Sequence, residues 1–154
     1  MTFRIAGLDP EPFLALAGLS DAALADRGVM RRVSDDSGFP CRVTLEDAPA
    51  GEPVLLMNFE HQPAATPFRS SHAIFVREGK AERYDRVGEV PALLRSRLLS
   101  VRAFDSADMM VDADVVSGED AANAIERFFA SPETAYLHIH YARPGCFAAR
   151  VDRA

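Results

Sequence analysis

The chain reads Ala135-Tyr-Leu-His-Ile-His-Tyr-Ala142, then Arg143-Pro-Gly145, and then Cys146-Phe-Ala-Ala-Arg-Val151. Alternating apolar and polar residues on both sides of a proline-glycine turn predict two antiparallel strands joined as a hairpin. Because side chains alternate across a strand, Leu137, Ile139 and Tyr141 point to one face, and His138 and His140 point to the other. One face is therefore expected to be buried, and the opposite face carries imidazoles.

The second strand of this hairpin extends both faces. We expect its apolar face to hold Phe147, Ala149 and Val151. We expect its other face to hold Cys146, Ala148 and Arg150. A thiol and a guanidinium then join the two histidines, and such a mixture is costly to bury without partners. This face is the candidate site for chemistry, although it does not by itself name a reaction.

The composition is that of an ordinary globular protein, with 154 residues, 48% hydrophobic and 26% charged. This length can bury well over half of the unfolded surface in one core, so we expect a single compact domain over residues 1–154. The net charge of -6 disfavours a nucleic-acid partner. No apolar run approaches the roughly 20 residues of a membrane helix, and no signal-peptide pattern opens the chain. We expect a cytoplasmic protein with reduced thiols at Cys41 and Cys146, rather than a disulfide between them.

Periodicity predicts the other elements. Alternation predicts a hairpin of 99–104 with 110–116, and apolar runs predict strands at 3–8, 29–33, 39–45, 54–59 and 73–77. Two prolines mark residues 60–67 as a loop. Helical spacing predicts short helices at 10–16, 21–27 and 91–98, and an amphipathic helix at 118–130 that packs on the Ile139 side. The expected class is α+β, an antiparallel-rich β-sheet with helices packed mainly on one face.

The segment Arg69-Ser-Ser-His72 lies where a loop enters a strand, and it presents a guanidinium, two hydroxyls and an imidazole. Arginine binds carboxylate or phosphate with two parallel hydrogen bonds. We therefore expect a small anionic ligand, which a hydrolase or transferase activity would suit, bound by Arg69, Ser70, Ser71, His72 and Arg150. Arg102 is expected on the same polar face. The alternative is that Arg69 pairs with Glu60 and that the serines only end the strand.

A metal ion is a second interpretation of the histidines. His138 and His140 lie ~6.6 Å apart along one strand face, a spacing at which two imidazoles can bind one ion. His72 or Cys146 would be the third ligand, so a zinc-dependent hydrolase with His72, His138 and His140 as ligands is an alternative. In the remaining alternative, hydrogen bonds or solvent satisfy these side chains in a non-catalytic structural or partner-binding protein.

Nucleophilic chemistry is a third interpretation. A histidine that activates Cys146 or Cys41 would give a thiolate nucleophile, and the candidate catalytic residues are His72, His138, His140 and Cys146. The alternative is that each cysteine serves only as a small, buried apolar side chain. Asp112 and Asp114 are either acid–base partners of the histidines or the solvated side of a sheet. The sequence has no glycine-rich phosphate loop and no Cys-x-x-Cys, which disfavours dinucleotide and thioredoxin-like enzymes.

Several segments together carry a resemblance. They are Gly38-Phe-Pro-Cys-Arg-Val-Thr-Leu-Glu-Asp47, Asn58-Phe-Glu-His-Gln-Pro63, Arg69-Ser-Ser-His-Ala-Ile-Phe-Val-Arg-Glu78, Met110-Val-Asp-Ala-Asp114 and Pro144-Gly-Cys-Phe-Ala-Ala-Arg-Val151. This combination resembles the bacterial domain-of-unknown-function family DUF1203, over essentially the whole chain. The resemblance implies a small single-domain bacterial protein without an established activity, and it assigns no catalytic residues.

Overall fold

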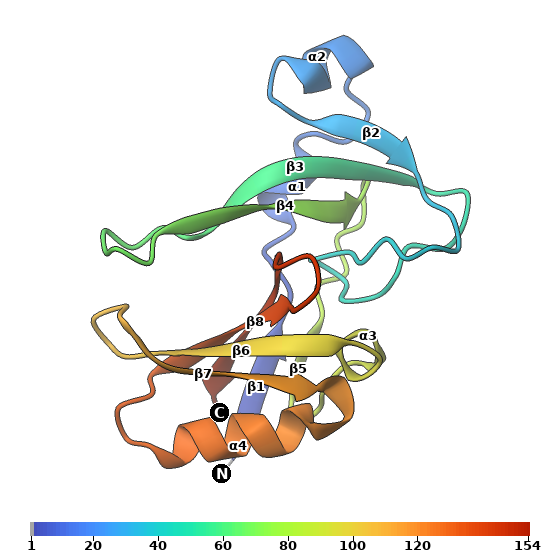
Figure 1. Cartoon of the computed structure of the whole chain (residues 1–154). Helices are drawn as coiled ribbons and strands as arrows, with labels where there is room; N and C mark the ends of the chain where they lie inside the picture. The colour runs from blue at the N-terminus through green and yellow to red at the C-terminus, as the bar shows by residue number, and fades with distance from the viewer. Residues whose placement is uncertain (1) are drawn as a thin grey trace.

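The computed structural model describes residues 2–154, and its strands form two antiparallel sheets (Figure 1). The larger sheet has the order β5-β1-β9-β8-β6-β7, and the smaller has the order β2-β3-β4. The strands are β1 (Phe3–Ala6), β2 (Met30–Val33), β3 (Pro53–Gln62), β4 (Ser70–Arg77), β5 (Asp85–Val87), β6 (Leu98–Phe104), β7 (Met110–Ser117), β8 (Tyr136–Tyr141) and β9 (Phe147–Arg153). The predicted α+β class with antiparallel strands is confirmed.

The helices are short, and none in the described part of the chain is long and apolar enough to cross a membrane. They are α1 (Glu11–Leu14), α2 (Asp21–Ala25), α3 (Ala92–Arg95), the 3-10 turn η1 (Gly118–Asp120) and α4 (Ala121–Ala130). Ser20 caps α2, because its hydroxyl accepts a hydrogen bond from the Ala23 amide. Helix α3 is shorter than predicted, since β6 already begins at Leu98.

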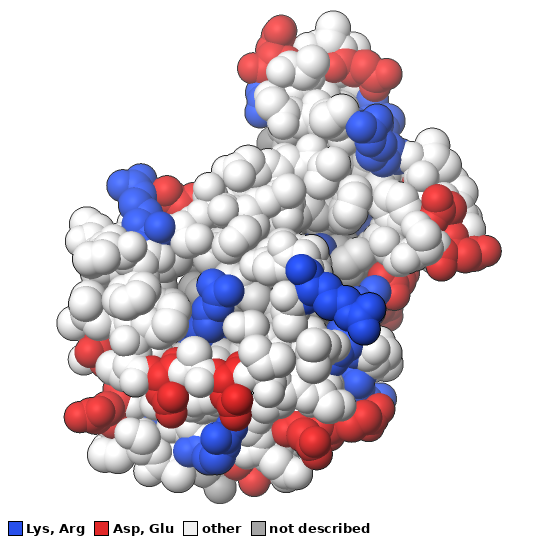
Figure 2. All heavy atoms as spheres, viewed as in Figure 1, with Lys and Arg blue, Asp and Glu red and all other residues white. Residues whose placement is uncertain are grey.

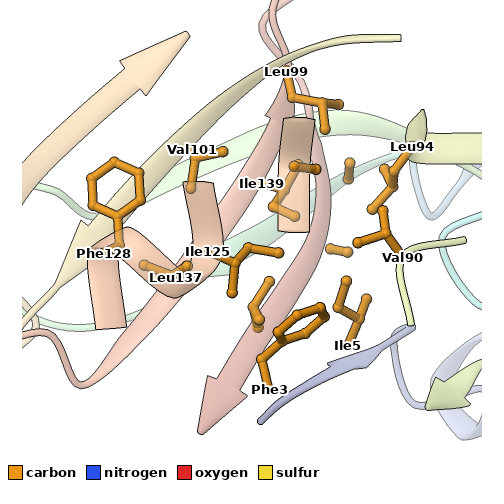
Figure 3. Close-up of a cluster of buried hydrophobic side chains, with 14 of the residues drawn as sticks. Phe3, Ile5, Val90, Leu94, Leu99, Val101, Ile125, Phe128, Leu137 and Ile139 are labelled. Atoms are coloured by element: carbon orange, nitrogen blue, oxygen red, sulfur yellow. The ribbon is translucent and has the colours of Figure 1, made fainter. Parts of the chain in front are cut away.

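Helix α4 covers one face of the larger sheet (Figure 1). Its Ile125 and Phe128 enter a core with Leu137 and Ile139 of β8, and all four side chains are nearly inaccessible, as predicted (Figure 3). The β6–β7 and β8–β9 hairpins pair as the alternation predicts. The amphipathic helix and the apolar face of β8 thus form the main core.

The smaller sheet has a core of its own and lies on the opposite side of β8 from α4 (Figure 1). Its central strand is β3, where the apolar run at 54–59 predicted a strand. Leu24 of α2 and Phe13 of α1 pack against Leu55 of β3 and Ile74 of β4. Because the two sheets face each other, every residue of β8 is buried, including both histidines.

The prediction of a strand at 39–45 is wrong. This segment forms a turn that belongs to neither sheet, and its β-bridges are isolated ones, Pro40 to Asp47 and Cys41 to Phe75. The backbone amides of this segment donate hydrogen bonds to different parts of the chain, and Leu45 has a positive φ of 50°. The prediction from alternating apolar and polar residues failed here because residues 41–45 are all buried, so this segment has no solvated face. Gly7 allows this turn to approach β1, since a Cβ at Gly7 would lie 2.1 Å from the Val43 carbonyl oxygen.

Two other boundaries differ from the sequence predictions. Strand β3 continues to Gln62, although Glu60 and His61 were expected in a loop. A β-bulge between Glu60 and Gln62 shifts the register beside Ser70, where β4 begins. A second bulge shifts the register between Ile139 and His140, so that His140 pairs with Phe147 while Ile139 pairs with Ala149. Phe147 therefore lies with the histidines, and the expectation that it shares the apolar face of Ala149 is wrong.

Candidate functional site

All four histidines of the chain meet between the two sheets. His138 and His140 come from β8 of the larger sheet, and His61 and His72 come from β3 and β4 of the smaller one. The ring of His61 is 5.7 Å from that of His138 and 5.0 Å from that of His140, measured between centroids. The ring of His72 is 5.3 Å from that of His140. We call His61, His72, His138 and His140 the histidine cluster.

Aromatic side chains enclose the histidine cluster. The ring of Phe147 is nearly parallel to that of His61, at 4.8 Å between centroids, and it meets His138 and His140 edge-on. Phe104 and Tyr136 stack on each other beside His138. The Tyr136 hydroxyl is fully engaged, because it donates to Asp108 and accepts from Gln62. These walls cover the three buried rings of the cluster, those of His61, His138 and His140.

Hydrogen bonds hold only part of the histidine cluster. His61 Nε2 lies 2.7 Å from His72 Nδ1, so one ring donates to the other. His140 Nδ1 lies 2.9 Å from the Gly145 carbonyl oxygen, to which it donates. His61 Nδ1 and His138 Nδ1 are buried and have no hydrogen-bond partner. Unpaired buried nitrogens cost stability, so hydrogen bonding alone does not account for this arrangement.

Burial keeps the imidazoles neutral. It lowers the pKa of His61 to about 4 and the pKa values of His138 and His140 to about 3, and the neighbouring His or Arg charges lower them further. The pKa of His72 is also lowered, chiefly by burial. Arg102 pairs with His138 across the strands, and burial lowers the pKa of its guanidinium. The only hydrogen bond of this guanidinium among the described residues is a long one to the Ser100 hydroxyl, 3.4 Å.

A pocket of about 710 Å³ adjoins the histidine cluster and shares His72 with it. Three arginines line the pocket, and no acidic residue does. The lining residues on which its chemistry depends are Arg42, His72, Arg97, Tyr141, Arg143 and Cys146. Apolar parts of the wall come from Leu56 and Phe75 of the smaller sheet. We call this cavity the arginine pocket.

Arg42 is the most deeply buried charge of the arginine pocket, with 2% of its surface exposed. Its guanidinium donates to the carbonyl oxygens of Pro40 and Phe147 and to the Cys146 sulfur, 3.1 Å away. None of these partners is a carboxylate, so the positive charge is solvated by dipoles and not neutralised. The turn at 41–45, which replaces the expected strand, is what directs this side chain inward.

The ring of Tyr141 lies close to two of these arginines. The guanidinium carbons of Arg42 and Arg97 are 5.1 and 5.4 Å from the centre of its ring. Its hydroxyl is buried without a hydrogen-bond partner, although the residue lines the pocket. Burial raises the pKa of this phenol to about 12, so the hydroxyl stays protonated and can donate a hydrogen bond at neutral pH.

The distribution of charged side chains on the surface is consistent with a basic pocket between the two sheets. On the face in Figure 2, basic side chains lie at the level between the two sheets, and acidic side chains gather lower down, over β7 and α4. Arg97 pairs with Asp47 at 3.0 Å, whereas Arg143, which is exposed, has no acidic partner among the described residues. The protein thus has a positive region although its net charge is -6.

The structure brings together some of the residues expected in one site and separates others. His72, His138 and His140 converge as expected, and Cys146 lines the arginine pocket with His72. Arg69 instead forms an exposed ion pair with Glu60 at 2.8 Å, the alternative that the sequence left open. Ser70 and Ser71 belong to β4 but do not line the pocket.

Arg150 and the carboxylates also lie apart from the pocket. The side chain of Arg150 pairs with Asp152 and covers the ring of Tyr136, with 4.0 Å between its guanidinium carbon and the ring centre. Asp114 pairs with Arg127 of α4, which places this carboxylate on the helix side of the sheet, away from the histidines. Cys41 is buried and accepts hydrogen bonds from backbone amides. Both cysteines are free, as expected.

The sequence did not single out five residues that the geometry makes prominent, namely Arg42, His61, Arg97, Tyr141 and Arg143. His61 was assigned to a loop because prolines follow it, and the bulge that extends β3 has no local sequence signal. A buried arginine with carbonyl partners cannot be recognised by periodicity. Tyr141 was expected on the apolar face, and the tertiary structure places it in the lining of the pocket as well, with an unpaired buried hydroxyl.

The fold and site define an α+β protein whose two antiparallel sheets enclose a histidine cluster beside an arginine-lined pocket. Residues 38–153 match the family described as "Protein of unknown function (DUF1203)". The chain therefore belongs to this family, and the resemblance noted in the sequence is confirmed. No curated protein and no solved structure matches the chain.

Proposed function

We propose that the protein binds a small organic anion, a carboxylate or a phosphate ester, in the arginine pocket. The observation that carries this proposal is the hydroxyl of Tyr141, a buried donor without a partner on a residue that lines the pocket together with three arginines. A bound anion would accept the hydrogen bond that this hydroxyl otherwise lacks. Buried polar groups are nearly always paired in folded proteins, so an unpaired donor in a pocket favours a ligand that pairs with it.

The charges of the pocket support the same ligand class. Arg42 has only carbonyl and sulfur partners, and Arg143 has no acidic partner among the described residues. The walls contribute positive charges and no carboxylate, so they attract anions and repel cations. Arg143 lies on the turn after β8, where its guanidinium is exposed and free to form two parallel hydrogen bonds with a carboxylate or phosphate.

The size of the pocket supports an organic anion over a bare inorganic ion. A volume of about 710 Å³ lies within the range of small-molecule sites. Leu56, Phe75 and Leu98 provide apolar surface next to the arginines. Such a wall binds a carbon skeleton, while the basic groups fix its charged end.

The test is a calorimetric titration with inorganic phosphate, an alkyl phosphate and an aromatic carboxylate. We expect at least one organic anion to bind more tightly than inorganic phosphate. Arg143→Ala should weaken that binding about tenfold or more, because a hydrogen bond to a charged group is lost. Tyr141→Phe should weaken it by a comparable factor.

Arg69→Ala is the matched control, because it removes an arginine that pairs with Glu60 outside the pocket. We expect this variant to bind the anion like the unmodified protein. Equal losses in Arg69→Ala and Arg143→Ala would show that binding depends only on overall charge, and would contradict the proposal. Failure of all three anions to bind would contradict it as well.

A further inference from the structure

We infer that His61, His138 and His140 form a binding site for a transition-metal ion of the zinc class, buried between the two sheets. One nitrogen from each ring can be chosen so that all three lie within 4.8 Å of one another. The three residues come from two different sheets, so the site exists only when the sheets are docked. This site is separate from the arginine pocket, and the inference does not depend on anion binding.

The hydrogen bonds around the histidine cluster orient the rings as metal ligands. In metal sites, a ligating histidine usually donates its other ring N–H to a nearby acceptor, which fixes its tautomer. His140 Nδ1 donates to the Gly145 carbonyl oxygen, which leaves Nε2 with a free lone pair. In the same way, donation from His61 Nε2 to His72 Nδ1 leaves the lone pair on His61 Nδ1, the buried nitrogen that has no partner.

The third ring completes the donor set. His138 is 2% exposed, and its Nδ1 is buried without a partner. A structural role for the histidine cluster would require this nitrogen and His61 Nδ1 to bond to something, and the described residues offer them no partner. A metal ion would engage the lone pairs of the cluster and remove the cost of burying them unpaired.

The chemistry of the donors selects the metal. The three ligands are neutral imidazoles, which suit zinc, copper, nickel and iron, whereas calcium and magnesium require oxygen ligands. Zinc–nitrogen bonds of about 2.0–2.1 Å at tetrahedral angles place the nitrogens roughly 3.3 Å apart, so binding would draw the rings inward. Three protein ligands leave a fourth position open for water or another ligand, the arrangement of catalytic zinc sites.

Arg102 influences what occupies the fourth position. Its guanidinium has no acidic partner among the described residues, and Arg102 lies opposite His138 in the strand pairing. An ion bound by three neutral ligands keeps its full charge beside this arginine. A negatively charged fourth ligand, such as hydroxide or a carboxylate, would balance both charges.

The test is a titration of chelator-treated protein with zinc, and with cobalt(II) as a spectroscopic probe. The unmodified chain should bind one zinc per molecule, with a rise in melting temperature. The cobalt complex should show the intense visible absorption of a four-coordinate site. Absence of stoichiometric binding by either ion would overturn the inference without need of any variant.

Variants then identify the ligands. His61→Gln, His138→Gln and His140→Gln should each lose stoichiometric binding and the cobalt absorption, while circular dichroism of the metal-free variants confirms that they fold. His72→Gln should keep the absorption and lose affinity about 10-fold to 100-fold, because His72 only positions His61. Loss of binding in His72→Gln with retention in His61→Gln would overturn the ligand assignment.

Two further variants separate this site from the arginine pocket. Cys146→Ser tests the thiol, which accepts a hydrogen bond from Arg42, and Arg143→Ala tests the pocket charge. Both should bind zinc with unchanged affinity. A clear loss in Cys146→Ser would place the metal at the thiol and overturn the inference, whereas failure of anion binding would leave the zinc results untouched.

Discussion

Tyr141 illustrates how a single side chain can serve the core and the pocket together. The residue belongs to the larger hydrophobic core and also lines the arginine pocket, and its hydroxyl is buried without a hydrogen-bond partner. The ring alone would explain burial, and phenylalanine would bury as well. The hydroxyl therefore lowers the stability of the ligand-free protein, and such a cost is expected where a residue serves binding.

We expect Tyr141→Phe to raise the free energy of unfolding of the ligand-free protein by about 1 kcal/mol, because the unpaired buried hydroxyl is removed. Equilibrium urea denaturation in an anion-poor buffer measures this difference. Tyr136→Phe is the control, since the Tyr136 hydroxyl bonds both Asp108 and Gln62. It should lower the stability by about 1–2 kcal/mol. If both variants lose stability equally, the Tyr141 hydroxyl has a partner in solution.

Helix α4 is the element whose position the sequence predicted best. Its apolar residues recur at helical spacing, and Ser117 precedes them as a cap whose hydroxyl accepts from the Glu119 amide. After this cap the chain first forms the 3-10 turn η1, and the α-helix itself starts at Ala121. The packing of this element on β8 keeps the larger sheet in place behind the histidines.

Phe128→Ala should lower the free energy of unfolding by ~3–5 kcal/mol, because Phe128 is only 3% exposed and its removal leaves a cavity. Glu126→Ala on the exposed side of the same helix is the control, and it should change the stability by less than ~0.5 kcal/mol. Denaturant titration of both variants provides the measurement. A loss below about 1 kcal/mol for Phe128→Ala would mean that the helix does not hold the core.

At the scale of the whole molecule, the docking of the two sheets buries the histidine cluster and couples folding to pH. The unfolded histidines titrate near 6.5, and burial lowers the pKa of His61 to about 4 and those of His138 and His140 to about 3. Below pH 6.5, the unfolded chain therefore binds more protons than the folded one. Stability is full above pH 6.5 and is lost as the pH falls.

For the metal-free protein, we expect the free energy of unfolding to decrease between pH 6.5 and 5 by up to ~1.4 kcal/mol per pH unit for each buried histidine. Above pH 5 the carboxylates remain ionised, so this window isolates the histidines. Urea titrations at successive pH values, with a chelator present, measure the slope. In His138→Gln the slope should become shallower, and a slope identical to that of the unmodified chain would show that His138 is not buried in solution.

Much of the fold could be predicted from local patterns. Alternation located the β6–β7 and β8–β9 hairpins, and a continuous apolar run located β3, because these strands have the faces that a sheet imposes on its residues. The prediction failed at 39–45, where every residue from Cys41 to Leu45 is buried and the backbone turns. Periodicity carries no information about a segment that is covered on all sides.

Less of the candidate site could be predicted. The faces of His138 and His140 followed from their spacing, and His72 was correctly expected near them. The arginines that were predicted to bind the anion, Arg69 and Arg150, instead form ion pairs with Glu60 and Asp152. The arginines of the pocket come from the turn at 41–45, from the residue just before β6 and from the turn after β8, and no local pattern connects these three segments.

The sequence by itself determined the α+β class, the central hairpin of β8 and β9, and an apolar face for helix α4, because each depends on neighbours within a few residues. The tertiary structure decided that a second sheet covers the histidines, that His61 joins them at a bulge, and that Arg42 and Tyr141 meet at the pocket. These contacts join residues far apart along the chain. Their formation depends on how two separate cores dock, and the alternation of side chains along one strand does not encode that docking.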